Sequence, residues 1–249
     1  MATGSVFILC ILLSPCYGDI SEDRPLYLAT SEFGVNLHKQ LTDGYHGNVV
    51  FSPLSVYTAL SMTLLGADGI TKKELESVLG VRHNENVHRQ LSSILTSMLT
   101  SGSDLNITID LANALFYDPR QLRVSDSYSQ NFSQYYGETL REIQRPDPER
   151  EVNSWVNRTT RGSIPELLET GTITEETTLL LINTMFFEAQ WKQMFNQKPT
   201  FAANFTTVLG SSIQVQTMMG DGHYFIKSFD PLNRLFWNFP TRAIASACS

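Results

Sequence analysis

Apolar residues recur at helical spacing in the first part of the chain. Between residues 26 and 41 they lie three or four positions apart, which predicts an amphipathic helix. Residues 49–51 indicate a short apolar strand. Ser52 and Pro53 follow it and supply a helix N-cap and the first helical position, where proline is tolerated. The helix that begins there is apolar or small on most faces, so we expect it to be central and buried.

Further helices are predicted by spacing and by end signals. Thr71 and Glu74 have the spacing of a capping box, and Gly80 would end the short helix that follows. The other patterns predict helices near residues 87–98, 128–135 and 152–156, with an exposed connection at 145–148.

Strands are predicted mainly in the second half. The segments are residues 105–117, 138–143, 178–187, 201–208, 213–219 and 223–227. The run 178–187 is apolar except at Asn183, which is typical of a strand covered on both faces, so Asn183 must find polar partners there. Helices early and strands late indicate an α+β class with large antiparallel sheets.

Composition narrows the class of protein. The 249 residues are 42% hydrophobic, which is enough for one large domain or two small ones. The net charge of −7 is spread along the chain, which argues against a nucleic-acid partner. No apolar run is long enough to span a membrane, so we expect no membrane partner.

The N-terminal residues resemble a leader. Residues 1–18 carry no charged side chain and include an apolar run at 6–13, which predicts a signal peptide cut after Gly18 and a secreted, extracellular protein. A buried N-terminal strand is the alternative. Cleavage would remove Cys10 and Cys16 and leave Cys248 alone, so no internal disulfide could form. Four sequons make candidate glycosylation sites of Asn106, Asn131, Asn157 and Asn204.

Several motifs in order resemble the serpin family of serine protease inhibitors. They are residues 48–62 with 65–75, Ala112-Asn-Ala-Leu-Phe, Val152-Asn-Ser-Trp-Val with 159–164, and Leu181-Ile-Asn-Thr-Met-Phe-Phe with Trp191. The resemblance covers about residues 33–227 and implies the serpin fold, with many helices and three β-sheets. It also implies suicide trapping, in which a protease cuts an exposed loop that then inserts into the main sheet as a strand. The implied partners are serine proteases, or cysteine proteases.

Two candidate sites follow from the residues and the resemblance. Ser52 and Ser55 lie at the start of a buried helix and can direct hydroxyls at the strand that carries Asn183. In serpins such a cluster is the shutter that governs opening of the sheet; the alternative is that Ser52 merely caps the helix. Trp191 corresponds to the breach, where the loop first enters the sheet, or is an ordinary core aromatic residue.

Other chemistry finds little support in the sequence. No G-x-S-x-G or H-E-x-x-H motif occurs, and the five histidines lack metal-ligand spacing, so we expect no enzyme, no cofactor and no metal. The carboxylates read as solvated surface. Arg89 with His83 and His88 is too sparse for a glycosaminoglycan site.

The resemblance stops near residue 234. We therefore divide the chain into a signal peptide (1–18), the N-terminal portion of a serpin domain (19–234) and an unrelated tail (235–249). Read one nucleotide out of register, suitable codons for the tail spell VLEFPYKGDRFSM, which resembles the expected serpin sequence and suggests a frameshift; a different exon is the alternative. The serpin fold would then be incomplete at the C-terminus, without the reactive centre loop, and the chain inactive as an inhibitor. The other hypothesis is a non-inhibitory secreted binding protein.

Overall fold

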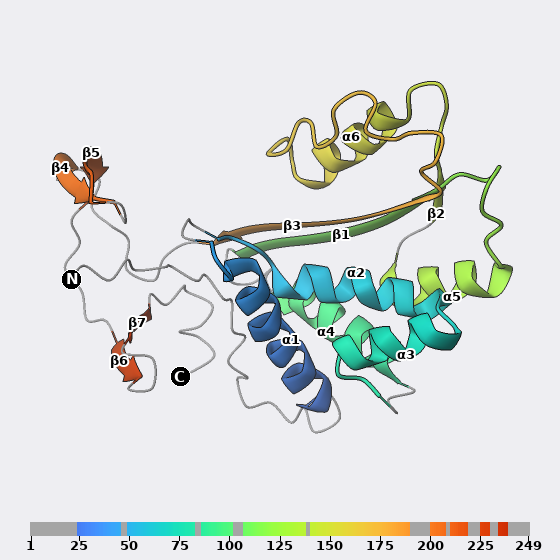
Figure 1. The fold of residues 1–249 in the computed structure, drawn as a ribbon, viewed down its shortest axis with the longest axis horizontal. Helices are drawn as coiled ribbons and strands as arrows, with labels where there is room; N and C mark the ends of the chain where they lie inside the picture. The colour runs from blue at the N-terminus through green and yellow to red at the C-terminus, as the bar shows by residue number, and fades with distance from the viewer. Residues whose placement is uncertain are drawn as a thin grey trace.

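The computed structural model describes the chain in segments. These are residues 24–45, 49–82, 86–101, 107–137, 140–189, 200–207, 210–218, 225–229 and 234–238. Within them it has six helices and seven strands (Figure 1).

The helices are α1 (Arg24–Thr42), α2 (Pro53–Gly66), α3 (Gly69–Val78), α4 (Val87–Ser101), α5 (Asp126–Tyr136) and α6 (Pro148–Thr159). The strands are β1 (Ile107–Tyr117), β2 (Leu140–Glu142), β3 (Leu179–Ala189), β4 (Phe201–Thr206), β5 (Ser212–Thr217), β6 (Phe225–Phe229) and β7 (Arg234–Asn238). The α+β class is confirmed.

Local signals explain where some helices begin. Ser52 caps α2, because its hydroxyl accepts from the Ser55 amide at 3.3 Å while Pro53 takes the first helical position, as predicted. The capping box expected at Thr71 is wrong. The Asp68 carboxylate lies three residues earlier and accepts from the Gly69 amide at 2.7 Å, so α3 begins sooner.

Three further expectations need correction. Residues 49–51 form no strand, and Val50 is 89% exposed. Pro148 is buried and starts α6 instead of belonging to an exposed connection. Asp118 and Glu149 are buried, and each carboxylate accepts hydrogen bonds that offset its loss of hydration, so reading all the carboxylates as solvated surface is wrong.

The described strands form three sheets. One has the order β2-β1-β3, and the other two are the antiparallel pairs β4-β5 and β6-β7. β1 and β3 run antiparallel along their full lengths, from the Ile107–Ala189 pair to the Tyr117–Leu179 pair, whereas β1 and β2 are parallel. β3 is therefore an edge strand among the described residues.

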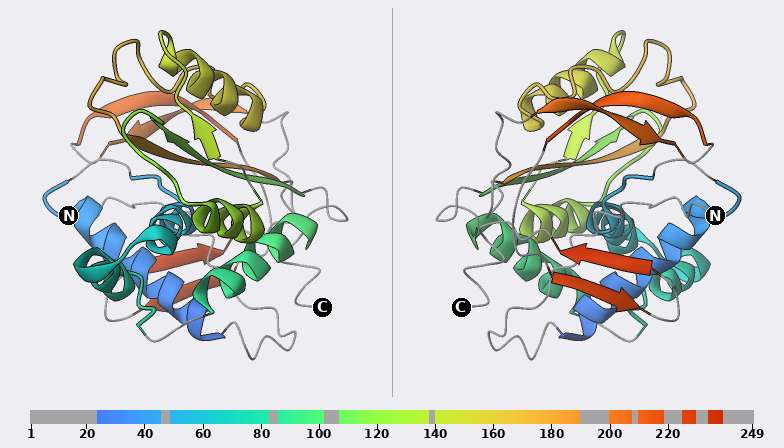
Figure 2. Two further views of the ribbon diagram at one scale, coloured as in Figure 1. Left: turned by 90° about the vertical axis from the view of Figure 1, so that its right-hand side faces the viewer. Right: turned by 90° about the vertical axis from the view of Figure 1, so that its left-hand side faces the viewer.

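Each face of this sheet is covered by its own apolar cluster. Figures 1 and 2 show α6 on one face and the helices α1 to α5 on the other. Leu181 packs against the helix-side cluster, whereas the next residue, Ile182, packs against the α6-side cluster, as alternation along a strand requires. The prediction of a strand covered on both faces is thus confirmed.

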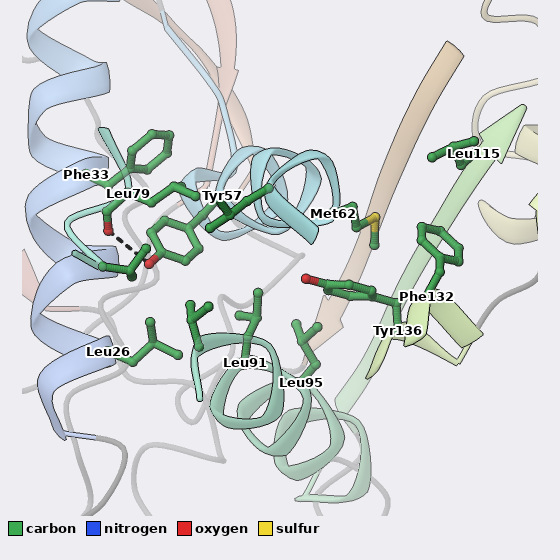
Figure 3. Close-up of a cluster of buried hydrophobic side chains, with 13 residues drawn as sticks. Leu26, Phe33, Tyr57, Met62, Leu79, Leu91, Leu95, Leu115, Phe132 and Tyr136 are labelled. Atoms are coloured by element: carbon green, nitrogen blue, oxygen red, sulfur yellow. Dashed lines mark hydrogen bonds between the residues drawn. The ribbon is translucent and has the colours of Figure 1, made fainter. Parts of the chain in front are cut away.

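The first cluster joins α1, α2, α4 and α5 (Figure 3). Tyr57, Leu91 and Phe132 are fully buried in it. The Tyr57 hydroxyl donates to the Leu79 carbonyl at 3.0 Å, which satisfies the one polar group that this ring brings into the core. In the second cluster the Phe116 and Trp155 rings meet edge to face at 6.3 Å and fix α6 on the sheet.

Candidate functional site

Two serines at the start of α2 form a small polar cluster beneath β3. The Ser55 hydroxyl donates to the Ser52 hydroxyl at 2.8 Å, and the Ser52 hydroxyl donates to the sulfur of Met185 at 3.2 Å. Ser52 thus both caps the helix and contacts the strand. The two readings of Ser52 that the sequence offered are compatible in one geometry.

Asn183 lies two residues before Met185 on the same face of β3. Its side-chain amide donates to the Asn113 side-chain oxygen, on the directly opposite residue of β1. The side-chain oxygen of Asn183 is buried and accepts no hydrogen bond from the described residues. A buried acceptor without a donor is destabilising, so this atom is where a further polar partner would be most favourable.

The cluster expected from Ser52, Ser55 and Asn183 is thus formed only partly by direct contacts among the three side chains. All three lie between α2 and β3, but the strand atom that Ser52 reaches belongs to Met185. Sequence reasoning missed Met185 because it is one apolar residue in an apolar run. It also missed the role of Asn113, although a polar residue between two alanines in a buried strand was a usable signal.

The remaining predicted site residues fall partly inside and partly outside the described segments. Trp191 and Asn106 lie outside the described residues, as do residues 1–18. Asn131 and Asn204 are exposed and Asn157 is half-buried. Glycosylation at the four sequons stays a prediction.

One histidine of the sparse basic group has an unusual environment. His88 Nδ1 lies 2.8 Å from the Tyr136 hydroxyl, and its ring stacks on Tyr135. Burial, and secondarily the charge of Lys72, lower the pKa of His88 to about 4. The ring is therefore neutral at pH 7 and brings no positive charge to a surface site.

The described segments offer no metal site and no membrane-spanning helix. Those segments hold no group of three or more His, Cys, Asp or Glu side chains placed to bind a metal ion. None of their helices has both the length and the apolar character needed to cross a membrane.

Comparisons with known proteins agree on one family. The sequence profile described as Serpin (serine protease inhibitor) matches residues 28–238. Serpin B8 of Bos taurus is 32% identical over 184 residues, which are 72% of this chain and 48% of that protein. Leukocyte elastase inhibitor A of Mus musculus is 31% identical over 71% of this chain and 47% of its own length. The chain therefore spans about half the length of these relatives.

A solved structure supports the same fold. Ovalbumin from emu (Dromaius novaehollandiae) matches with a TM-score of 0.76 at 25% identity, covering 87% of this chain and 60% of the ovalbumin chain. The arrangement of helices and sheets is thus one that a known full-length protein contains.

The relatives correct the predicted location. Serpin B8 and leukocyte elastase inhibitor A are intracellular proteins, so the prediction of a secreted, extracellular protein is wrong. That prediction rested on a short, uncharged apolar run and on four sequons. The run lacks the basic side chains that precede the apolar part of a signal peptide, and each sequon is a triplet that is common by chance.

Proposed function

The chain belongs to the serpin family, and we propose that its 249 residues supply the strand-accepting part of a serine protease inhibitor without the loop that a protease cuts. Two statements follow. A full-length protein with this N-terminal part would trap serine proteases. The 249 residues by themselves would not.

The observation that carries the proposal is the edge of β3. This strand of 11 residues packs on one face through Leu181 and on the other through Ile182, and it pairs on one side with β1, while no described strand pairs with its other side. Such a strand offers a row of backbone donors and acceptors to an added strand, with apolar surfaces ready above and below. Loop insertion needs this combination.

The cluster beneath β3 supports a shutter role for Ser52, Ser55 and Asn183. Ser52 links α2 to β3 through Met185, and Asn183 keeps a buried oxygen available for a donor. We propose that an inserted or neighbouring strand would bring that donor. Trp191 would then mark the breach, eight residues further along the chain.

The proposed partners follow from the family. Leukocyte elastase inhibitor A is by its name an inhibitor of a protease, and we propose serine proteases as the targets of a full-length protein here. In this role the protein is a substrate-like trap, so we propose no catalytic residue of its own.

The test uses covalent trapping. The 249-residue chain is incubated with trypsin, chymotrypsin and neutrophil elastase, and products are separated by SDS gel electrophoresis, with leukocyte elastase inhibitor A as the positive control. We expect no SDS-stable complex from the chain. Any such complex would refute the second statement.

A chimera tests the first statement. Residues 24–233 are joined to the part of leukocyte elastase inhibitor A that this chain does not cover. We expect the chimera to form an SDS-stable complex with elastase, because the strand-accepting part and a loop are then in one chain. A chimera that melts cooperatively but only serves as a substrate would refute the strand-accepting role.

A further inference from the structure

The connection between α6 and β3 has no helix or strand of its own. We call residues 160–178 the strap; it runs from the end of α6 to the start of β3 (Figure 1). Its side chain Ile173 is 5% exposed and belongs to the second apolar cluster, and Leu168 packs against the same cluster. The strap therefore covers apolar surface that would otherwise meet water.

Side chains of α6 hold the middle of the strap. Asn153 accepts from the amides of Leu167 and Leu168, both at 2.9 Å, and donates to the Leu168 carbonyl at 2.8 Å. One turn earlier, Glu149 accepts from the amides of Gly171 and Ile173 at 3.1 and 2.7 Å. The bond from Ile173 is the main reason that the Glu149 pKa is lowered. The hydrogen bonds of this part of the strap thus go to side chains of α6.

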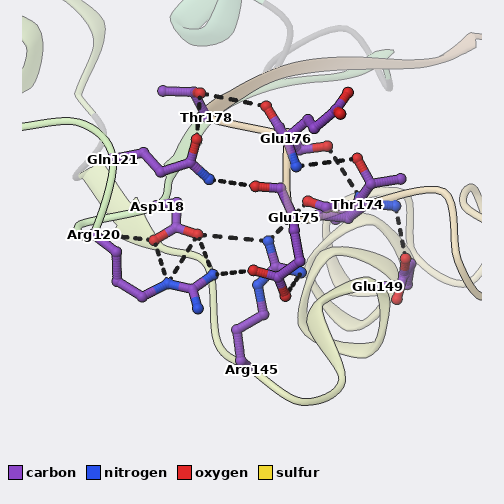
Figure 4. A network of polar contacts seen from close by, with 11 residues as sticks. Asp118, Arg120, Gln121, Arg145, Glu149, Thr174, Glu175, Glu176 and Thr178 are labelled. Carbon is purple, nitrogen blue, oxygen red and sulfur yellow. Dashed lines mark hydrogen bonds and ion pairs between the residues drawn. The ribbon is translucent and has the colours of Figure 1, made fainter.

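A separate attachment fixes the end of the strap to the sheet (Figure 4). Asp118 follows β1 directly, and its side chain is only 2% exposed. Its carboxylate accepts from Arg120 Nη2 at 2.7 Å and Nε at 3.0 Å, and Arg145 Nη2 lies 3.5 Å away. The hydrogen bonds from the side chain and backbone of Arg120 hold the pKa of Asp118 far below its usual range.

Both arginines also reach the strap. Arg120 contacts the Glu175 carboxylate at 2.9 Å and Arg145 contacts it at 3.3 Å, while Arg145 donates to the Thr174 carbonyl at 2.9 Å. The four side chains come from three separate segments: the turn after β1, the connection between β2 and α6, and the strap. Removal of Asp118 would leave two neighbouring guanidinium groups with one exposed carboxylate between them.

We propose that one group of charged side chains holds the strap closed over the second apolar cluster. We call it the Asp118 cluster, and it consists of Asp118, Arg120, Arg145 and Glu175. Asp118 is the positioning residue, because it is the buried member and orients both arginines. Opening of the cluster frees residues 174–178 and the start of β3, whereas Ile173 stays bonded to Glu149 and α6 stays on the sheet through Trp155 and Val156. The strap is then a separately opening element of the fold.

Hydrogen–deuterium exchange of the whole chain, read by mass spectrometry, tests this. Asp118→Asn keeps the size of the side chain and removes its charge, and Glu176→Gln removes a charge from an exposed strap residue outside the cluster. We expect exchange in residues 174–180 to be at least tenfold faster in Asp118→Asn and unchanged in Glu176→Gln. Exchange in residues 148–159 should stay the same in both.

Two further readouts separate this role from a general structural one. Arg120 is 56% exposed, so Arg120→Gln is a milder variant and should speed exchange in the same segment to a smaller extent. In the unaltered chain 1 M salt should also speed exchange in this segment, because screening weakens the exposed ion pairs of Glu175 with Arg120 and Arg145. Unchanged exchange in Asp118→Asn would overturn the proposal. So would an increase spread equally over α2 and α4, which would mean that Asp118 serves global stability.

Discussion

The buried pair Asn113 and Asn183 permits a quantitative test. Asn113 is 4% exposed, and its side-chain oxygen is the acceptor for the Asn183 amide. Asn113→Ala leaves that buried amide without an acceptor, which costs about 2 kcal/mol of unfolding free energy. Asn183→Ala leaves the Asn113 oxygen unpaired, but it also removes an oxygen that has no described donor, so the loss should be smaller, about 1 kcal/mol.

The double variant distinguishes an interaction from two independent losses. It leaves neither partner unpaired, so its loss should fall short of the sum of the single losses by about 1–2 kcal/mol. Urea unfolding followed by circular dichroism at 222 nm measures each free energy. Asn131→Ala combined with Asn183→Ala is the control, because Asn131 is exposed on α5 and the two effects should add. Additive losses for the buried pair would refute the reasoning.

Other predictions concern the first cluster and its surroundings. Phe132→Ala should lower the unfolding free energy by about 3–5 kcal/mol in urea titrations, while Phe201→Ala, at a 45% exposed side chain, should leave it nearly unchanged. The pKa of His88 in the folded chain is about 4, below its ordinary value of 6.5, so the unfolded chain binds the proton at a higher pH than the folded chain does. The unfolding free energy should therefore fall by on the order of 2 kcal/mol as the pH drops from about 6.5 to 4. His88→Gln should flatten that slope in melting curves. Gly137 ends α5 with φ +69°, so Gly137→Ala should cost about 1 kcal/mol, and an unchanged urea midpoint would contradict this.

Local and periodic signals predicted most of the main body of the fold. The start of α2 could be read from Ser52 and Pro53 because cap and proline act on their own helix end. β3 could be read from its continuous apolar run because coverage on both faces removes alternation. The start of α3 could not be predicted, because Asp68 and Thr71 lie three residues apart and both are good helix caps. Their capping free energies differ by less than the free energy of tertiary packing.

The site was predicted less completely, for a geometric reason. Alternation along a strand puts Asn183 and Met185 on one face, but it does not decide which of them meets the Ser52 hydroxyl. The burial of Asp118 was beyond sequence reasoning, because its partner Arg145, and Glu175, which shares that arginine with it, lie 27 and more residues away and no local pattern connects them. Long-range ionic contacts leave no periodic trace.

The central position of α2 has a consequence for synthesis in the cell. α2 packs against α1, α3, α4, α5 and β3, yet it ends at Gly66 while β3 begins at Leu179. At translation rates of about 5–20 residues per second, β3 follows α2 by roughly 6–20 s. During that interval the ribosome-bound chain carries a helix whose sheet-facing side chains have no cover, so we expect a holding chaperone to occupy them until β3 has left the exit tunnel.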